Sequence, residues 1–149
     1  MKLNGFKVMI FLSLITVRFD NSIAQNRINK YPVALKGYDL LSYFEGNPIK
    51  GRKTFQVVYG QSVYRFTNLE RANIFGLDPE RYLPKYDGFC AYGISVNGKR
   101  YKSNPKHYQV IDNRLYLFYK TPFFNSTKKW NQLNKREAIR QADIHWCKK

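Results

Sequence analysis

The chain has 149 residues and a formal net charge of +16, from 26 Lys and Arg against 10 Asp and Glu. This length suits one domain with a single core, and no later apolar stretch is long enough for a membrane helix. No repeat of fixed period and no linker rich in Gly, Ser or Pro divides the sequence.

The N-terminus has the pattern of a secretory signal peptide. Lys2 and Lys7 precede an apolar run over residues 8–17, and small residues surround Ala24. This pattern predicts a signal peptide over residues 1–24. An apolar run of this length falls short of the roughly 20 residues that span a bilayer. We therefore expect a periplasmic or secreted protein without a transmembrane segment once the signal is removed.

After the signal peptide, we expect a leader over residues 25–33 and a single domain over residues 34–149. Removal of residues 1–24 leaves a net charge of +14. Such a charge favours a diffuse attraction to anionic polymers or lipids of the cell surface. Nucleic acid is not an expected partner, because export separates the protein from it and the basic residues are spread along the chain.

The middle of the chain begins with a predicted hairpin and a helix. Residues 53–59 and 62–67 are rich in β-branched and aromatic residues, and Gly60-Gln61 separates them as a hairpin turn would. Thr67 and Glu70 stand at capping-box spacing. A helix is therefore predicted directly after the second strand.

A short helix and two further hairpins are predicted next. Asp78 is the expected N-cap of a helix with Pro79 in its first turn, and Pro84 ends it. Asn97-Gly98 and Asp112-Asn113 each separate apolar segments and suit type I′ turns. Both dipeptides are therefore predicted to close β-hairpins.

The C-terminal segment is predicted to be helical. Ser126 or Thr127 is the expected cap, and Ala138, Ala142 and Trp146 lie on one apolar stripe. The expected fold class is α+β, with a small antiparallel sheet of hairpins, short helices and a C-terminal helical segment.

Several separated motifs resemble the YHS domain family, in particular the exported single-domain YHS proteins of bacteria. They occur in order at residues 36–44 (KGYDLLSYF), 63–67 (VYRFT), 78–84 (DPERYLP), 88–93 (GFCAYG), 115–119 (LYLFY) and 142–146 (ADIHW). The resemblance covers nearly all of residues 34–146. It implies a binding domain that is presumed to hold a metal ion, with copper as the candidate metal.

The thiols of the metal-linked YHS members are missing from this chain, both at residues 39–42 and in the helix that starts near residue 67. Soft metals such as Cu(I) and Zn(II) take thiolate or imidazole ligands. A copper or zinc ion would therefore depend on the other soft donors after residue 24, which are Cys90, His107, His145 and Cys147. For each histidine a structural place, His107 on a strand and His145 at a helix edge, is an alternative.

Cys90 and Cys147 have a second use in an oxidising compartment, where disulfides persist. A Cys90–Cys147 bond would tie the C-terminal helix to the central motif and would stabilise the fold by roughly 4 kcal/mol in the chain-entropy model. A buried Cys90 with a free, exposed Cys147 is the alternative. A reactive redox thiol lacks support, because no Cys-x-x-Cys pair is present.

A small ligand near Cys90 is the remaining binding hypothesis. Glycines on both sides of Cys90 permit close approach of the backbone, and four aromatic residues surround it in sequence: Tyr82, Tyr86, Phe89 and Tyr92. No catalytic residues are assigned, because the common nucleophile, phosphate-loop, zinc-protease and dinucleotide motifs are absent.

These observations predict an exported YHS-type binding protein that holds a metal ion or a small ligand near Cys90. The alternative is a structural or accessory protein without metal, in which Cys90 is buried or bonded to Cys147.

Overall fold

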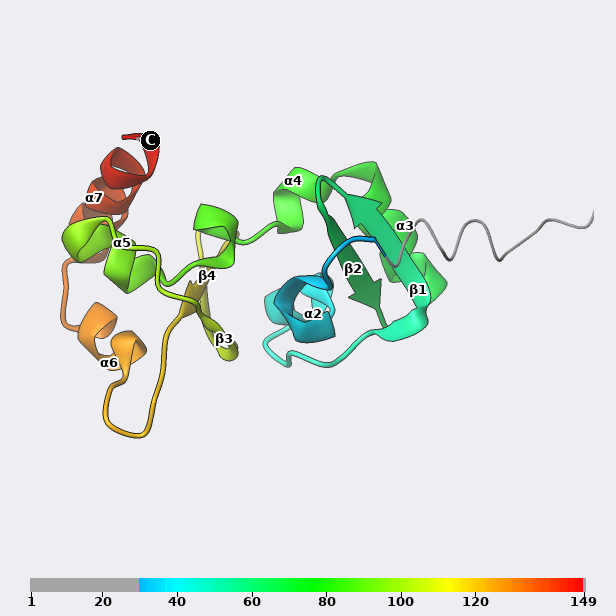
Figure 1. Ribbon diagram of the computed structural model, residues 1–149, viewed down its shortest axis with the longest axis horizontal. Helices are drawn as coiled ribbons and strands as arrows, with labels where there is room; N and C mark the ends of the chain where they lie inside the picture. Colours follow the sequence, from blue (N-terminus) through cyan, green and yellow to red (C-terminus); the bar gives the residue numbers. More distant parts are fainter. Residues whose placement is uncertain (1–29, 149) are drawn as a thin grey trace, which may run out of the picture.

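The computed structural model describes residues 30–148 (Figure 1). The predicted signal peptide, residues 1–24, and most of the predicted leader, residues 25–33, lie outside these described residues. Within residues 30–148, no helix has both the length and the apolar character needed to cross a membrane. The described part contains six α-helices and two antiparallel sheets of two strands each, which confirms the predicted α+β class.

The elements follow one another in two similar series. Residues 30–82 hold the 3-10 helix η1 (Ala34–Gly37), helix α2 (Leu40–Phe44), strands β1 (Arg52–Tyr59) and β2 (Ser62–Phe66), and helices α3 (Leu69–Leu77) and α4 (Pro79–Tyr82). Residues 83–148 hold the 3-10 helix η2 (Lys85–Gly88), helix α5 (Ala91–Asn97), strands β3 (Asn104–Ile111) and β4 (Arg114–Phe118), and helices α6 (Ser126–Asn131) and α7 (Lys135–Cys147).

The two series are structural repeats, although no repeat of fixed period is visible in the sequence. Each hairpin loses its regular pairing at the same place, between Arg52 and Gln56 in β1 and between Asn104 and Tyr108 in β3. Isolated bridges outside the strands also correspond: Val33 with Val63 and Pro84 with Leu115, then Tyr38 with Lys50 and Phe89 with Lys102. Matching positions lie 51 or 52 residues apart, so a search for one fixed period misses them.

Two of the predicted hairpins are confirmed. Strands β1 and β2 pair across Gly60, whose φ of 56° lies in the left-handed region. Strands β3 and β4 pair across Asp112 and Asn113, with φ values of 49° and 54°. Two successive positive φ angles are what a type I′ turn requires, and Asp and Asn tolerate them better than most residues.

The third predicted hairpin, across Asn97-Gly98, is wrong. Asn97 is the last residue of α5, and Gly98 ends this helix with a φ of 70°. The Gly98 N–H donates to the carbonyl of Ile94 at 3.0 Å. The same left-handed glycine that suits a tight turn also suits the end of a helix, and the packing of α5 against α7 selects the helix.

The predicted N-cap of α3 is displaced by one residue. Asn68, and not Thr67, accepts the N–H of Arg71 at 2.9 Å. Thr67 is engaged elsewhere, because its hydroxyl donates to the carboxylate of Asp39 at 3.0 Å. A contact between distant segments therefore overrides the local capping signal.

The C-terminal segment consists of two helices. Asn125 caps α6 by accepting the N–H of Thr127 at 3.1 Å, in place of the predicted Ser126 or Thr127. Asn134 then caps α7. Ala138 and Ala142 are buried, so the predicted apolar stripe does form the inner face of α7.

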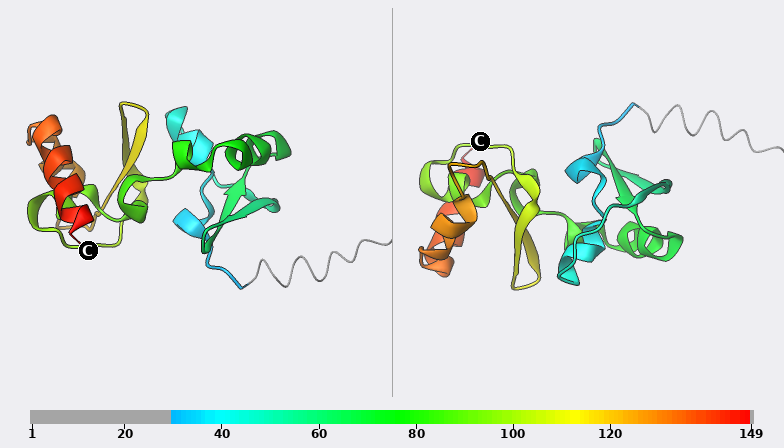
Figure 2. Two further views of the ribbon diagram at one scale, coloured as in Figure 1. Left: turned by 90° about the horizontal axis from the view of Figure 1, so that it is seen from above. Right: turned by 90° about the horizontal axis from the view of Figure 1, so that it is seen from below.

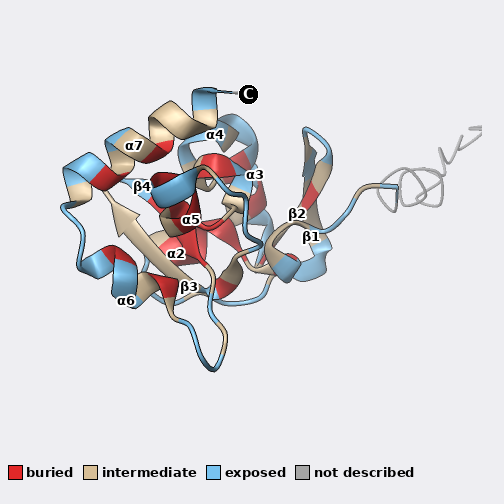
Figure 3. Cartoon of the chain, turned by 60° about the vertical axis from the view of Figure 1, so that its left-hand side comes forward, coloured by how far each residue is buried: buried red, intermediate tan, exposed pale blue. Residues whose placement is uncertain are grey.

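Strand β4 lies between two hydrophobic clusters and is buried along most of its length. Leu115 and Leu117 pack with the first repeat, whereas Tyr116 and Phe118 pack with α5, α6 and α7. Both views of Figure 2 show the β3–β4 hairpin standing between the first repeat and these helices. Figure 3 shows the buried residues gathered around α2, α5 and β4. The second hairpin therefore joins the repeats through their side chains.

Candidate functional site

Cys90 lies at the junction between η2 and α5, where the backbone is held on two sides. Its N–H donates to the carbonyl of Tyr101 at 2.9 Å, and it forms a parallel bridge with Leu117. The side chain is 1% exposed, and the thiol donates to the hydroxyl of Ser126 at 3.3 Å. The Ser126 hydroxyl in turn donates to the carbonyl of Tyr119 at 2.6 Å. Cys90 is thus a positioned, almost fully buried thiol.

A cavity of about 350 Å³ opens next to Cys90. Its walls come from α5, from the segment before β3 and from the segment that joins β4 to α6. The aromatic rings form a continuous arc, with centroid distances of 6.3 Å from Tyr101 to Tyr119, 6.2 Å from Tyr119 to Phe124 and 6.2 Å from Phe124 to Tyr92. The remaining lining residues are Gly93, Val96, Asn97 and Ser126. The cavity is therefore mainly apolar, with a few hydrogen-bonding groups.

Of the predicted ligand-binding residues, Cys90 and Tyr92 line this cavity. Tyr86 lies in the core, where its hydroxyl donates to Asp143 at 3.0 Å. Burial and the neighbouring Asp143 raise the pKa of Tyr86. Phe89 packs near Trp146 at a centroid distance of 6.4 Å. These contacts make Tyr86 and Phe89 part of the packing under α7.

Tyr82 belongs to the other repeat. Its ring meets Phe44 edge-on at 5.5 Å, and the Arg81 guanidinium lies 5.5 Å from its centre. It does not line the Cys90 cavity. Tyr82 therefore helps to seat α4 against α2.

The four soft donors proposed as metal ligands do not form a common site. Within residues 30–148, no three His, Cys, Asp or Glu side chains are placed to share a metal ion. The Nδ1 of His145 is 2.7 Å from the carbonyl of Ile94. Desolvation and, second, the charge of Lys120 lower the pKa of His107. Among the described residues, these four donors therefore do not supply a three-ligand site for a copper or zinc ion.

Cys90 and Cys147 are not bonded to each other in the structure. Both thiols are free, with Cys90 buried and Cys147 exposed at the end of α7. This arrangement corresponds to the alternative of a packed Cys90 and a free Cys147.

The sequence prediction missed three walls of the cavity, Tyr101, Tyr119 and Phe124. Tyr101 follows Asn97-Gly98, where a hairpin is predicted that the structure does not contain. Tyr119 directly follows β4, and this position at the end of a strand was the one sequence feature that could have pointed to it as a lining residue. Phe124 lies in an irregular segment, and no local pattern relates it to Cys90.

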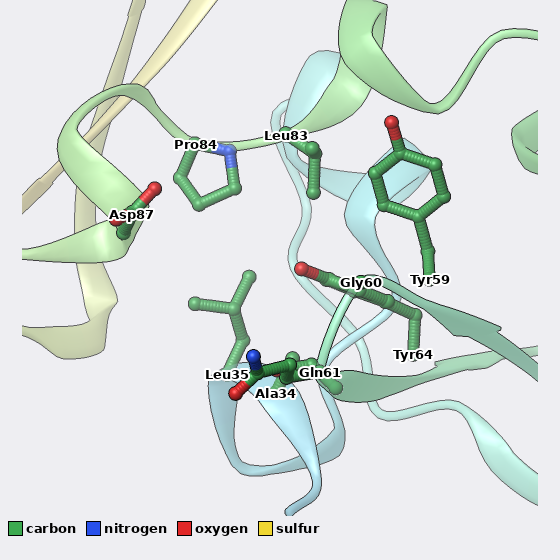
Figure 4. A pocket seen from close by; sticks show the side chains of 10 residues that line it. Ala34, Leu35, Tyr59, Gly60, Gln61, Tyr64, Leu83, Pro84 and Asp87 are labelled. Atoms are coloured by element: carbon green, nitrogen blue, oxygen red, sulfur yellow. The ribbon is translucent and has the colours of Figure 1, made fainter. Parts of the chain in front are cut away.

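A second cavity, of about 450 Å³, lies between η1, the β1–β2 turn and the segment that joins the repeats. Figure 4 shows the hydroxyl of Tyr64 directed into the space between Leu35 and Leu83. Burial and, next, the charge of Asp87 raise the pKa of Tyr64. This cavity is more polar than the one at Cys90, and the predicted site residues do not line it.

Comparison of the chain with protein-family models, with curated proteins and with solved structures finds no match, so the proposals below rest on the residues and their geometry.

Proposed function

We propose that the protein is an exported, YHS-type binding protein that holds a small, mainly apolar ligand in the cavity beside Cys90. One observation carries this proposal: Cys90 and four aromatic side chains from three separate segments converge on one cavity. Its volume of about 350 Å³ falls within the roughly 300–1,000 Å³ range of small-molecule sites. The signal-peptide pattern and the resemblance to exported YHS proteins support the location.

The lining suggests what kind of ligand fits. Aromatic walls provide large contact areas for a flat or elongated apolar body. The Cys90 thiol already donates to Ser126 at 3.3 Å, so its sulfur offers a polarisable apolar surface to a ligand. The Asn97 amide and the tyrosine hydroxyls remain as the polar groups of the lining. We therefore expect a ligand with an apolar body and one or two hydrogen-bonding groups.

A metal-centred function has less support, because the four soft donors do not gather among the described residues. The structural or accessory alternative has one supporting observation, the burial of Cys90. The ligand-binding proposal and the structural alternative differ in what they require of the cavity. A ligand-binding protein needs it, whereas a purely structural protein does not.

Binding of a neutral aromatic probe tests the proposal. We expect millimolar indole to shift the backbone amide signals of Tyr92, Gly93 and Ser126 in a heteronuclear NMR titration. Val96→Trp should abolish these shifts, because Val96 lines the cavity and is 55% exposed, so a larger ring can fill the opening without entering the core.

Val58→Trp is the matched control, because Val58 is 40% exposed on β1 and does not line the cavity. This variant should bind indole as the unaltered protein does. Shifts that persist in Val96→Trp, or no shifts at all in the unaltered protein, would contradict the proposal.

The basic charge supports a second expectation, contact with an anionic cell surface. Residues 83–148 carry 13 Lys and Arg against four acidic residues, whereas residues 30–82 carry eight against five. The net charges of +9 and +3 place most of the positive field on the second repeat. We propose that this repeat faces the anionic surface.

A further inference from the structure

Phe123 is the most exposed large apolar side chain of the described residues, at 99%. It lies between β4 and α6, in a loop that protrudes from the second repeat in Figure 1. Its neighbour Phe124 is 40% exposed and packs near Tyr92 and Tyr119. Phe124 thus lines the cavity, whereas the preceding residue, Phe123, points into solvent.

The loop that presents Phe123 is held by hydrogen bonds. The Thr121 N–H donates to the carbonyl of Phe124 at 2.8 Å, and the Phe124 N–H donates to the Thr121 hydroxyl at 3.1 Å. Lys120 and Asn125 form an antiparallel bridge at its base. Phe123 is therefore displayed at the tip of an ordered turn.

A single exposed phenylalanine has no functional meaning without a second observation. Charge supplies it. Asp112 is the only acidic residue among residues 88–136, which include ten Lys and Arg. Lys120, Lys128 and Lys129 flank the loop and are exposed.

We infer that the loop of residues 120–125 docks the protein on an anionic membrane surface. Phe123 enters the interfacial region of the bilayer, and Lys120, Lys128 and Lys129 contact acidic headgroups. An apolar side chain combined with nearby basic residues is the usual requirement for reversible binding at a membrane interface. The inference rests on the proposed anionic surface contact and names both its partner, an anionic lipid, and the contacting element.

Co-sedimentation with lipid vesicles tests this inference. The exported protein, after a mass-spectrometric check that residues 1–24 have been removed, should bind vesicles of phosphatidylcholine with phosphatidylglycerol and should not bind phosphatidylcholine alone. Phe123→Ser should weaken binding by about 10-fold, the equivalent of losing a single inserted apolar side chain.

Leu77→Ser is the matched control, because Leu77 is 87% exposed at the end of α3 in the first repeat. It should bind as the unaltered protein does. Equal weakening by Phe123→Ser and Leu77→Ser, or weakening by neither, would overturn the assignment of the loop while leaving the anionic surface contact in place. Absence of any preference for phosphatidylglycerol would overturn both.

A second pair of variants separates local from total charge. The triple change of Lys120, Lys128 and Lys129 to Gln should weaken vesicle binding more than the same change at Lys30, Lys36 and Lys53, although both remove three charges. All six lysines are exposed. Equal losses in the two triple variants would show that net charge alone attracts the protein and would overturn the inference.

Discussion

Asp39 and Cys90 occupy the same position in the two repeats. Each precedes the first α-helix of its repeat, and each donates its N–H to an equivalent carbonyl at 2.9 Å, Asp39 to Ile49 and Cys90 to Tyr101. Both side chains are buried. Asp39 is the centre of a polar network, whereas Cys90 makes one bond to Ser126 and borders a cavity. The two copies of one motif have thus acquired different chemistry.

The Asp39 network should be a main source of stability in the first repeat. Its carboxylate accepts the N–H of Leu41 at 3.0 Å and the N–H and hydroxyl of Thr67 at 2.9 and 3.0 Å, and it lies 3.6 Å from the Arg71 guanidinium. We expect Asp39→Ala to lower the free energy of unfolding by about 3–5 kcal/mol, because the change leaves buried donors without a partner.

Urea denaturation of Asp39→Ala measures this loss, and Asp78→Ala is its control. Asp78 is exposed and makes no capping hydrogen bond through its side chain. Its replacement should change the free energy of unfolding by no more than about 0.5 kcal/mol. A similar effect of both variants would show that the network contributes little.

The two thiols should differ in accessibility. Cys147 is exposed and Cys90 is buried, and the two are not bonded. An Ellman titration should therefore detect one thiol in the folded protein and two after denaturation without reductant. Mass spectrometry of the labelled native protein should place the label on Cys147. Detection of no thiol under denaturing conditions would contradict the free state of both cysteines.

Two glycine substitutions should have opposite effects on stability. A Cβ at Gly93 would overlap the ring of Tyr101, whereas a Cβ at Gly76 in α3 would meet nothing within 4 Å. We expect Gly93→Ala to destabilise the protein by about 1–3 kcal/mol and to shift Tyr101 in the cavity wall. Gly76→Ala should stabilise it by about 0.5–1 kcal/mol through improved helix propensity. Thermal unfolding measures both, and stabilisation by Gly93→Ala would contradict the placement of Tyr101.

Stability should decrease at alkaline pH, with Tyr86 as one cause. Burial and the adjacent Asp143 raise the pKa of Tyr86 above the ordinary value. Because the folded pKa is the higher one, the stabilisation is complete below the ordinary tyrosine pKa of about 10 and is lost as pH rises beyond it. Urea denaturation between about pH 8 and pH 11, which brackets the ordinary tyrosine pKa, should show the decrease in the free energy of unfolding.

Tyr86→Phe should reduce this alkaline loss, because it removes the titrating hydroxyl. Asp143→Asn keeps a hydrogen-bond acceptor for Tyr86 and removes the negative charge, so Tyr86 should ionise at lower pH than in the unaltered protein. An ultraviolet difference titration of tyrosinate detects the change. Identical titration curves for Asp143→Asn and the unaltered protein would contradict the role of Asp143.

Local sequence patterns were reliable where one short segment sets its own conformation. Gly60 and the Asp112-Asn113 pair closed the expected hairpins, since a turn of this kind depends on the φ angles of two residues. The α+β class followed from the same patterns. Asn97-Gly98 failed, because one left-handed glycine is compatible with both a turn and a helix end.

The cavity and the repeat could not be read from the chain. Tyr101, Tyr119 and Phe124 reach Cys90 from segments 11 to 34 residues away, and the distance along the chain carries no information on which side chains meet. The repeat is hidden because most matching positions differ in residue type, as Asp39 and Cys90 do, and because its spacing changes from 51 to 52 residues.

The amino-acid sequence was sufficient for the class of fold, two of the hairpin turns, the inner face of α7 and the net basic charge. Long-range packing was needed to place Cys90 beside a cavity, to keep it apart from Cys147, and to pack Phe124 near Tyr92 and Tyr119 while Phe123 faces solvent. The physical reason is that backbone turns and helices depend on neighbours in sequence, whereas burial and pairing of side chains depend on how β4 and α5 pack with the helices that follow.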